Sequence, residues 1–329
     1  MGQMVSLRQI RSFVAVYEAA SFTGAATREG ATQSGISQHI KQLEAELGVS
    51  LLARSGRTVE PTAAGRLYYA ECVDVLKRLD AAQQGVAVKA LQGKVRVGLM
   101  PTFTRSVLAP ALDKFLNSTP GAEISIIEAY SGVLTEMVLN GELDFAVVPA
   151  FEGTTGLSQQ LIIRDREMLV SSRRRLAEHL KPVRLRDLGA LKIILPGMQN
   201  TRRRTIETYF STNDVRVVQR LELDAMMGTL QLVAASDWVA VLPFVMMMSD
   251  LDGDRFTIRP LDDPPFHSEF VLIEPSRRAM SPVAARFAGI LKAEAEQAGV
   301  VFRSRIKAKP ASKAAPKRHR APPAPPGSR

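Results

Sequence analysis

The chain has 329 residues and a net charge of +10, with 46% hydrophobic and 23% charged residues. This composition is that of a globular protein of two or three domains, and it excludes a disordered chain. The single cysteine, Cys72, excludes an intrachain disulfide framework and a cysteine-based zinc site. With no secretory signal and no apolar run long enough for a membrane helix, we expect a cytoplasmic protein without a membrane partner.

Nearly all of the net charge lies at the C-terminus. Residues 303–329 hold nine Lys or Arg and no acidic residue, and they are rich in Pro and Ala. We expect this basic Pro/Ala/Lys tail to be disordered. It either adds salt-dependent affinity for DNA without specificity or serves only as a solubilising extension. The overall charge therefore says little about the folded domains.

Three helices are predicted in the N-terminal segment. Ser6 and Gln9 have the spacing of a capping box ahead of a first amphipathic helix. Two further helices are predicted over residues 22–29 and 33–47, separated by a turn that contains Gly30. Two helices joined by a tight glycine-containing turn are typical of a helix-turn-helix.

A hairpin and a long helix are predicted next. The hairpin spans residues 51–60 with its turn at Ser55 and Gly56, which makes it a candidate wing. The helix spans about residues 63–93, and its apolar residues recur at heptad spacing. The predicted stripe comprises Tyr69, Cys72, Leu76, Leu79 and Val86. Because such a helix has little to pack on locally, we expect the stripe to contact a partner helix; the alternative is packing on its own domain.

From Lys94 the pattern changes to short apolar strands that alternate with amphipathic helices. This alternation is typical of an α/β domain with a mostly parallel sheet, and about 200 residues suffice for two lobes. Strands are predicted at 95–99, 124–128, 143–148, 168–171, 192–195, 238–242 and 270–273, and helices at 106–116, 133–140, 202–210, 226–235 and 282–298.

Several N-terminal segments carry a resemblance to a known family. Residues 7–13 (LRQIRSF), 21–26 (SFTGAA), 36–44 (ISQHIKQLE) and 46–49 (ELGV) resemble the DNA-binding domain of LysR-type transcriptional regulators. Residues 141–146 (GELDFA) resemble a loop and strand of that family's effector domain.

The resemblance implies an α/β protein with an all-α-type N-terminal winged helix-turn-helix and a two-lobed effector domain similar to periplasmic binding proteins. The expected parts are a DNA-binding domain (1–62), a linker and dimerisation helix (63–93) and the effector domain (94–302). In the effector domain, lobe I is expected at about 94–165 and 268–302, and lobe II at about 166–267. The resemblance also implies a homodimer, or a tetramer built as a dimer of dimers, that acts on RNA polymerase.

Five residues depart from the pattern of this family, and one of them is Ser34, which follows Gln33 where the family often has proline. Glu29 and Ala31 stand where the family usually has apolar residues, and Gln38 and Glu60 stand where it often has basic ones. These changes lower the positive charge of the surface that would face DNA.

The candidate DNA-binding residues lie on the second helix of the helix-turn-helix and on the wing. The N-terminal part of that helix enters the major groove in proteins of this kind. Glutamine pairs with adenine and serine contacts several bases, whereas lysine and arginine suit phosphate. The set is Gln33, Ser34, Ser37, Gln38, Lys41, Arg54 and Arg57. The alternative is a solvated polar face.

The candidate effector-binding residues follow predicted strands and begin helices, where backbone amides attract anions. They are Thr102, Phe103, Thr104, Ser131, Asn200, Thr201 and Arg202. We expect a small, anionic, carboxylate-bearing effector with Arg202 or Arg203 as its countercharge. The alternatives are helix caps for the hydroxyl groups and a solvated helix face for the arginines.

An enzyme is not expected. None of the four histidines pairs at metal-ligand spacing, and no phosphate-binding loop or nucleophile elbow is present, so we predict neither a metal nor a cofactor. The sequence therefore predicts a LysR-type regulator that binds an interrupted inverted repeat near promoters. The alternative is a nucleoid-associated protein with weak sequence preference, which the basic tail would suit.

Overall fold

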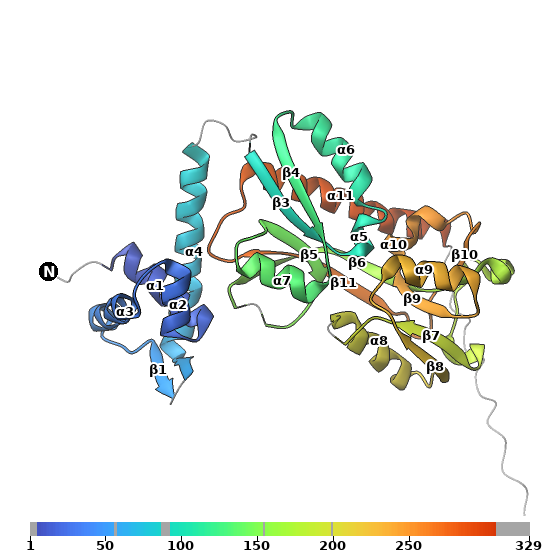
Figure 1. Cartoon of the computed structure of the whole chain (residues 1–329), viewed down its shortest axis with the longest axis horizontal. Coiled ribbons are helices and arrows are strands. Elements are labelled where there is room, and N and C mark those ends of the chain that lie inside the picture. Colours follow the sequence, from blue (N-terminus) through green and yellow to red (C-terminus); the bar gives the residue numbers. More distant parts are fainter. Residues whose placement is uncertain (1–4, 56–57, 87–92, 154, 199, 307–329) are drawn as a thin grey trace, which may run out of the picture.

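The computed structural model describes residues 5–55, 58–86, 93–153, 155–198 and 200–306. An N-terminal helical domain and a larger α/β domain lie end to end, and a long helix stands at the boundary between them (Figure 1).

The N-terminal domain packs three helices and a hairpin around one core. Its elements are α1 (Leu7–Ala19), α2 (Phe22–Glu29), α3 (Gln33–Leu47), β1 (Leu52–Ser55), β2 (Thr58–Pro61) and the boundary helix α4 (Ala63–Val86). Phe13, Ile36 and Leu43 are buried at its centre, as their helical spacing predicts. The capping box is present, since the Ser6 hydroxyl accepts from the Gln9 amide and the Gln9 side chain accepts from the Ser6 amide.

Lobe I of the α/β domain is built first along the chain. Its elements are β3 (Gly93–Leu99), α5 (Pro101–Thr104), α6 (Leu108–Ser118), β4 (Ala122–Glu128), α7 (Ser131–Leu139) and β5 (Phe145–Pro149). Strand β3 pairs in parallel with both β4 and β5. The β-α-β connections therefore place helix N-termini at the carboxyl edge of these strands.

Lobe II repeats this arrangement. Its elements are β7 (Leu191–Leu195), α8 (Thr201–Thr212), β8 (Val217–Glu222), α9 (Met226–Ala235), β9 (Val239–Pro243), α10 (Phe244–Met247) and β10 (Phe256–Pro260), with 3-10 turns at Arg173–Glu178, Leu185–Leu188 and Met248–Asp250. Strand β7 pairs in parallel with β8 and β9.

One long strand, β6 (Leu157–Ser172), connects the lobes. Its first part pairs with β11 (His267–Pro275), and its last residues pair with β9 and β10. The strand order is β4-β3-β5-β11-β6-β9-β7-β8, with β10 beside β6. All pairings of β6 and β11 are antiparallel. The expected mostly parallel sheet is therefore mixed, because the strands that cross between the lobes run against those within them.

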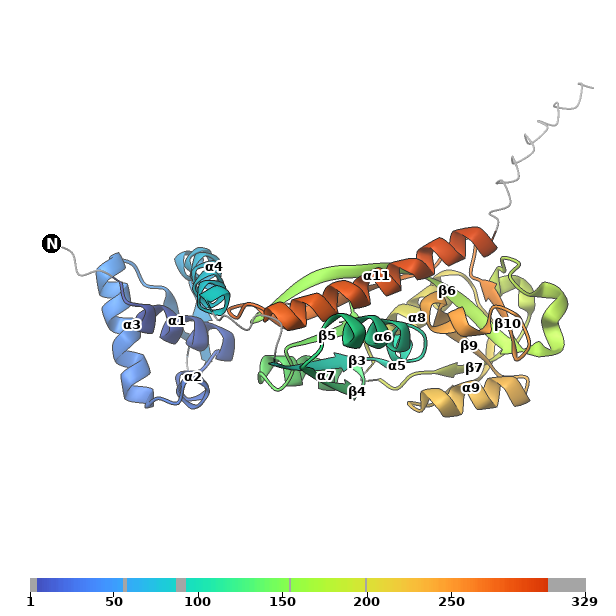
Figure 2. The same ribbon diagram turned by 90° about the horizontal axis from the view of Figure 1, so that it is seen from above.

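The last helix, α11 (Pro282–Arg305), runs along the whole α/β domain (Figure 2). It packs on α6 and β3 in lobe I and on α10 in lobe II. Its Phe287 ring meets Phe115 of α6 edge-to-face, with 5.0 Å between the ring centroids. The prediction of a disordered tail from residue 303 is wrong for its first residues, because the helix continues to Arg305 and Ile306 is buried. Residues 307–329 lie outside the described part of the chain.

Candidate DNA interface and effector cleft

Helix α3 presents a polar face to solvent at its N-terminal end. The Thr32 hydroxyl caps the helix by accepting from the Gly35 amide at 3.1 Å. Gln33, Ser34, Gln38 and Lys41 are exposed and Ser37 is half-buried. The opposite face holds Ile36, Ile40 and Leu43, all buried against the rest of the domain.

Two hydrogen-bonded links fix the orientation of α3. The Ser12 hydroxyl of α1 lies 2.8 Å from Nδ1 of His39. At the other end, the Glu44 carboxylate accepts from the backbone amides of Leu51 and Leu52, at 2.7 and 3.1 Å, where β1 begins. These bonds hold α3 against α1 and against the start of the wing. Arg54 lies in β1 opposite Val59, and Arg57 lies outside the described residues.

The predicted dimerisation stripe is wrong for Tyr69, Cys72 and Leu76, which pack within their own domain. Cys72 and Leu76 of α4 are 2% and 5% exposed because they pack into the core of their own N-terminal domain. The Tyr69 ring stacks on Tyr17 of α1, with 3.9 Å between centroids. Leu79 is half-buried beside α1, and Val86 ends the helix. Packing within the domain therefore accounts for Tyr69, Cys72 and Leu76, and the assignment of Leu79 and Val86 to a dimer contact stays a prediction.

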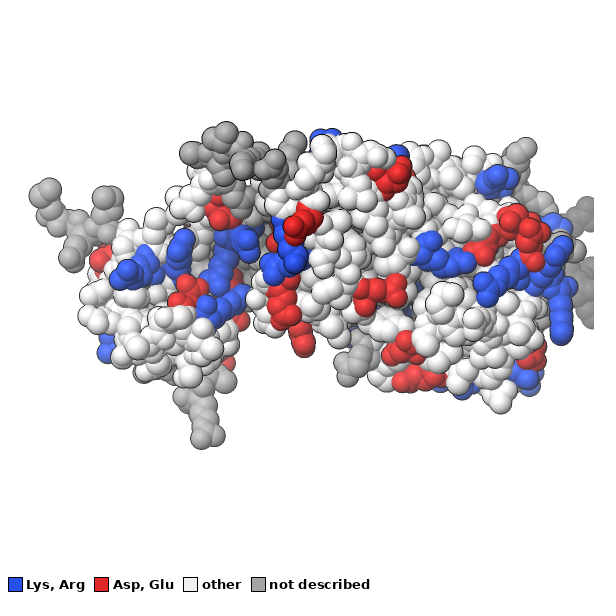
Figure 3. All heavy atoms as spheres, turned by 45° about the horizontal axis from the view of Figure 1, so that its top comes forward, with Lys and Arg blue, Asp and Glu red and all other residues white. Residues whose placement is uncertain are grey.

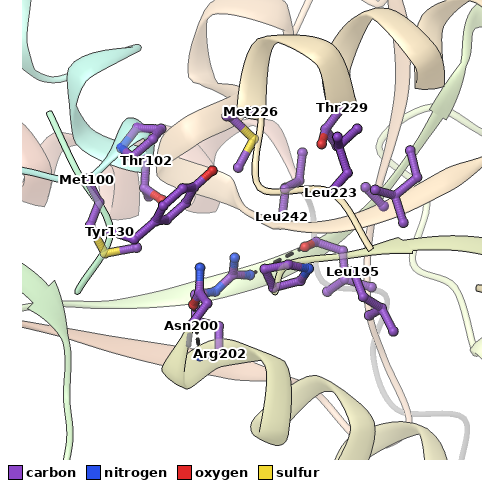
Figure 4. Close-up of a pocket in the computed structure, with 15 residues that line it drawn as sticks. Met100, Thr102, Tyr130, Leu195, Asn200, Arg202, Leu223, Met226, Thr229 and Leu242 are labelled. Carbon is purple, nitrogen blue, oxygen red and sulfur yellow. Dashed lines mark hydrogen bonds between the residues drawn. The ribbon is translucent and has the colours of Figure 1, made fainter. Parts of the chain in front are cut away.

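A closed cleft lies between the two lobes, where the carboxyl ends of their parallel strands face each other (Figure 4). Lobe I contributes Met100, Pro101, Thr102 and Tyr130, and lobe II contributes Ile194, Leu195, Pro196, Asn200, Arg202, Leu223, Met226, Thr229, Ala240, Val241 and Leu242. Most of the lining is apolar, with a few polar groups set among it, as in many small-molecule sites.

The cleft is too small for an effector in this conformation. Its cavity of about 30 Å³ has room for only a few waters. The Tyr130 hydroxyl donates to the Asp224 carbonyl oxygen at 2.6 Å and so bridges the lobes. Outside Tyr130 a hollow of about 480 Å³ opens between the lobes, and Thr104 and Glu128, which hydrogen-bond to each other, lie at its edge. An occupant of the cleft requires Tyr130 to move.

A buried ion pair forms the floor of the cleft. Nη2 of Arg202, at the N-terminus of α8, lies 2.8 and 2.7 Å from the two carboxylate oxygens of Glu167 on β6. The Glu167 side chain is fully buried and also accepts from the Ser268 hydroxyl at 2.5 Å. Nε of Arg202 is buried without a hydrogen-bond partner among the described residues. The ion pair thus joins the cleft floor to the strands that connect the lobes.

A second carboxylate lies two residues away on β6. Asp165 is 4% exposed and accepts from the Val245 amide at the start of α10, at 2.7 Å. Burial, opposed by that hydrogen bond and reinforced by nearby Glu167, raises the pKa of Asp165 to about 7.

Two family models match the chain over these same two parts. The model described as bacterial regulatory helix-turn-helix protein, lysR family, matches residues 7–66, and the LysR substrate binding domain matches residues 89–296. The chain belongs to the LysR family of transcriptional regulators. LysR-family regulators bind DNA and small-molecule effectors, and they are not enzymes. Among the described residues no helix is long and apolar enough to cross a membrane.

The relatives agree with this assignment along most of the chain. The nitrogen assimilation regulatory protein nac of Escherichia coli K12 is 26% identical over 85% of this chain and 92% of its own length. The regulator BenM of Acinetobacter baylyi is 26% identical over 73% of this chain and 80% of its own length. Full-length BenM covers 89% of this chain and 98% of its own with a TM-score of 0.54 at 22% identity. CbnR bound to its target DNA covers 88% and 99% with a TM-score of 0.52 at 24% identity.

The structure brings only some of the predicted effector residues of this LysR-family chain to the cleft. Thr102, Asn200 and Arg202 line the cleft, and Ser131 is buried at the start of α7, where its hydroxyl has no hydrogen-bond partner among the described residues. Thr104 lies at the outer hollow. The side chains of Phe103 and Thr201 lie elsewhere. Phe103 is buried in the core against Phe270, and Thr201 is exposed on α8.

Sequence reasoning missed Tyr130, Thr229 and Glu167. Tyr130 directly precedes Ser131, just after a predicted strand. The search for polar residues between a strand and the next helix, which selected Ser131, could therefore have found it. Thr229 lies within a predicted helix whose orientation the pattern does not give. Glu167 stands in a strand with no local signal, and its role depends on Arg202 being folded beside it.

Proposed function

We propose that this chain binds an interrupted inverted repeat near promoters, as at least a dimer, and responds there to a small effector. The observation that carries the proposal is the capped, exposed polar end of α3 on the same chain as a closed two-lobed cleft. Binding in the cleft would shift the lobes, alter DNA bending and so change recruitment of RNA polymerase. This requires an effector that binds one arrangement of the lobes better than the other. A cytoplasmic location stays a prediction.

The sequence preference is assigned to the N-terminal half of α3. Gln33, Ser34, Ser37 and Gln38 would contact base edges, and Lys41, Arg54 and Arg57 would contact phosphates. Support comes from the exposed side chains on α3 and from the buried face that fixes the direction in which they point.

The test is fluorescence anisotropy with the DNA upstream of the protein's own coding region and with scrambled DNA, over a salt series. We expect Gln33→Ala to weaken specific binding about 10- to 100-fold and to leave non-specific binding within about threefold, because a two-pronged base contact is worth about 1–3 kcal/mol. Gln42→Ala is the matched control, since Gln42 is exposed on the same helix more than two turns further on. Equal losses on both DNAs for Gln33→Ala would refute base reading by this residue.

Dimerisation is assigned to the outward face of α4. Leu67 is 76% exposed and Val75 is 46% exposed. Ala63, Ala70 and Ala81 lie on the same side of the helix as Leu67 and are also exposed. We expect Leu67→Asp to shift sedimentation toward the monomer, whereas Val300→Asp, at an exposed site on α11, should not. An unchanged oligomer in the first variant would place the interface elsewhere.

The effector is proposed to be a small anion bound by hydrogen-bond donors rather than by a free cation. Arg202 is already paired with Glu167, and Arg203 contacts Glu207, Glu222 and the Pro196 carbonyl oxygen. The open donors are Nε of Arg202 and the Ser131 hydroxyl. The N-terminus of α8, capped by Asn200, adds a favourable dipole for an anion.

A thermal-shift screen with small mono- and dicarboxylates and their neutral amides tests this assignment. Stabilisation by a carboxylate, absent with its amide and reduced at least tenfold in apparent affinity by Thr102→Ala, is the expected result. Val133→Ala, at an exposed site on α7, is the control. Stabilisation by neutral or cationic compounds alone would refute an anionic effector.

Removing the basic tail distinguishes the proposed regulator from the alternative, a nucleoid-type protein. The comparison is between the full chain and a chain ending at Ile306, the last described residue. If the protein is a sequence-specific regulator, the shortened chain should keep a preference of about a thousandfold for its own site. Equal binding to both DNAs, raised equally by residues 307–329, would favour the nucleoid role.

A further inference from the structure

The N-terminal domain contacts lobe I of its own chain through polar groups. Acidic and basic side chains alternate where the two domains meet (Figure 3). From the N-terminal side the contacts come from the ends of α1 and α2 and from one face of α4. From lobe I they come from Leu139, Gly156 and residues 274–279.

The centre of this boundary is a buried carboxylate. The Glu18 side chain is 1% exposed, and its Oε2 lies 2.8 Å from Nη1 of Arg28 and 3.9 Å from Nε of Arg277. The Tyr69 hydroxyl donates to Oε1 of Glu18 at 3.1 Å and accepts from the Gly156 amide. Groups from both domains therefore surround this carboxylate and exclude water from it.

Arg277 forms the main ion pair across the boundary. Its Nη1 lies 2.8 Å from Oε1 of Glu29, at the C-terminal end of α2. A carboxylate here is accounted for by the arginine that lobe I places opposite it.

Two further contacts run along α4. Nζ of Lys77 lies 2.7 Å from the Glu274 carboxylate, and the Asp80 carboxylate accepts from the Ala279 amide at 2.8 Å. Tyr69, Lys77 and Asp80 are spaced so that they lie on one side of the helix. This side of α4 therefore contacts lobe I, whereas Leu67 is 76% exposed.

We propose that the N-terminal domain docks on lobe I of its own chain through a latch of Glu18, Arg28, Glu29 and Arg277, and that this docking sets the orientation of α3 relative to the effector domain. The latch does not use the exposed residues of α3, so the docked chain can still bind DNA. Arg277 follows β11 directly, and β11 pairs with the strand that joins the lobes. A shift between the lobes therefore has a short path to the latch.

The docking is tested on the full chain by hydrogen exchange. We expect Arg277→Glu to speed exchange of amides in residues 26–31 and 274–280 about tenfold or more, because it places a third carboxylate beside Glu18 and Glu29. Arg204→Glu is the control, since Arg204 is exposed on α8 in lobe II and its side chain makes no polar contact among the described residues. The double variant Glu29→Lys/Arg277→Glu should recover most of the protection. The fluorescence of Trp238, in lobe II, checks that the effector domain stays folded.

Two results would overturn the docking. One is equal exchange of these amides in the Arg277→Glu and Arg204→Glu chains. The other is protection recovered by mixing the Glu29→Lys and Arg277→Glu single variants, since that requires contact between two chains. If Arg277→Glu does not fold, Arg277→Gln takes its place, with a smaller acceleration of the same amides.

The orienting role rests on the proposed function and has its own readout. Energy transfer between dyes at the two ends of the bound DNA reports its bend. We expect Arg277→Glu to change the transfer efficiency while affinity for a single half-site stays within about threefold. An unchanged bend with faster exchange would refute the orienting role and leave the docking standing. Loss of half-site binding in the parent chain would instead refute the proposed function.

Discussion

Replacing Arg202 by methionine should destabilise lobe II strongly. The Glu167 carboxylate would remain fully buried, with the Ser268 hydroxyl but without its cation. Breaking a buried ion pair from one side costs about 3–5 kcal/mol, because the remaining charge is left uncompensated. Asp165, two residues away on the same strand, would shift further toward its protonated form, because the Arg202 charge that lowers its pKa would be gone.

A double variant distinguishes the cost of an unpaired buried charge from the loss of the ion pair itself. In Arg202→Met/Glu167→Gln no buried charge is left without a partner, and the glutamine can still form a hydrogen bond with Ser268. We expect it to be at least about 2 kcal/mol more stable than Arg202→Met alone, since neutral replacement of buried pairs is often tolerated.

The chain offers a convenient probe for this measurement. Trp238 is the only tryptophan in the sequence and directly precedes β9 of lobe II. Urea unfolding followed by its fluorescence gives the stability of that lobe for the parent chain, both single variants and the double variant. A cost below about 1 kcal/mol for Arg202→Met, or strict additivity in the double variant, would refute an energetically coupled buried pair.

Three further predictions concern other sites. Gly65→Ala should destabilise the N-terminal domain by at least about 2 kcal/mol, because the added Cβ would lie 2.0 Å from the Leu51 carbonyl oxygen. Gly289→Ala is the control, since open space surrounds this position on α11 and the change should be neutral or slightly stabilising. Thermal unfolding followed by circular dichroism compares the two variants. For Asp165, the folded pKa of about 7 lies above the unfolded value of 3.8, so its protonation stabilises the fold below about pH 4 and this contribution is lost as pH rises to 7. Urea titrations should therefore show the parent chain losing stability relative to Asp165→Asn between pH 4 and 7, and parallel pH profiles would contradict this. Tyr130→Phe should raise the open population of the cleft about fivefold, since one net hydrogen bond is worth about 1 kcal/mol, and exchange of amides 223–227 should rise accordingly.

Local signals in the sequence were sufficient for the helix-turn-helix. The caps Ser6, Thr32 and Gly30 act within a few residues of themselves, and the bounds predicted from them for α2 and α3 agree with the structure. The two lobes could also be predicted, because the alternation of strands and helices is likewise a local pattern in the sequence. Strands β8 and β10 were missed: β8 is largely exposed and carries polar residues, whereas the turn signals Asp252-Gly253 and Pro260 on either side of β10 could have indicated it.

Long-range partners explain the remaining errors. The heptad spacing of Cys72 and Leu76 is equally compatible with a partner helix and with α1, and only the folded domain distinguishes them. Arg202 has the position expected of an effector's countercharge, yet Glu167, 35 residues earlier, already neutralises it. No pattern within one element of the chain records such a pairing, since both residues must first be placed by their own strands and helices.

The closed cleft limits how the effector can act. Tyr130 bridges the lobes with one hydrogen bond, which is worth about 1 kcal/mol net, so this bond alone shifts the ratio of closed to open lobes by only about fivefold. A complete switch from one state to the other needs about 5.5 kcal/mol of differential affinity. The apolar side chains from both lobes that line the cleft, and the open Nε donor of Arg202 at its floor, are where an effector could gain that difference. An effector that bridges the lobes would therefore favour closure, and one too large to let Tyr130 return would favour the open state. The size of the ligand, and not only its charge, then decides the direction of the response.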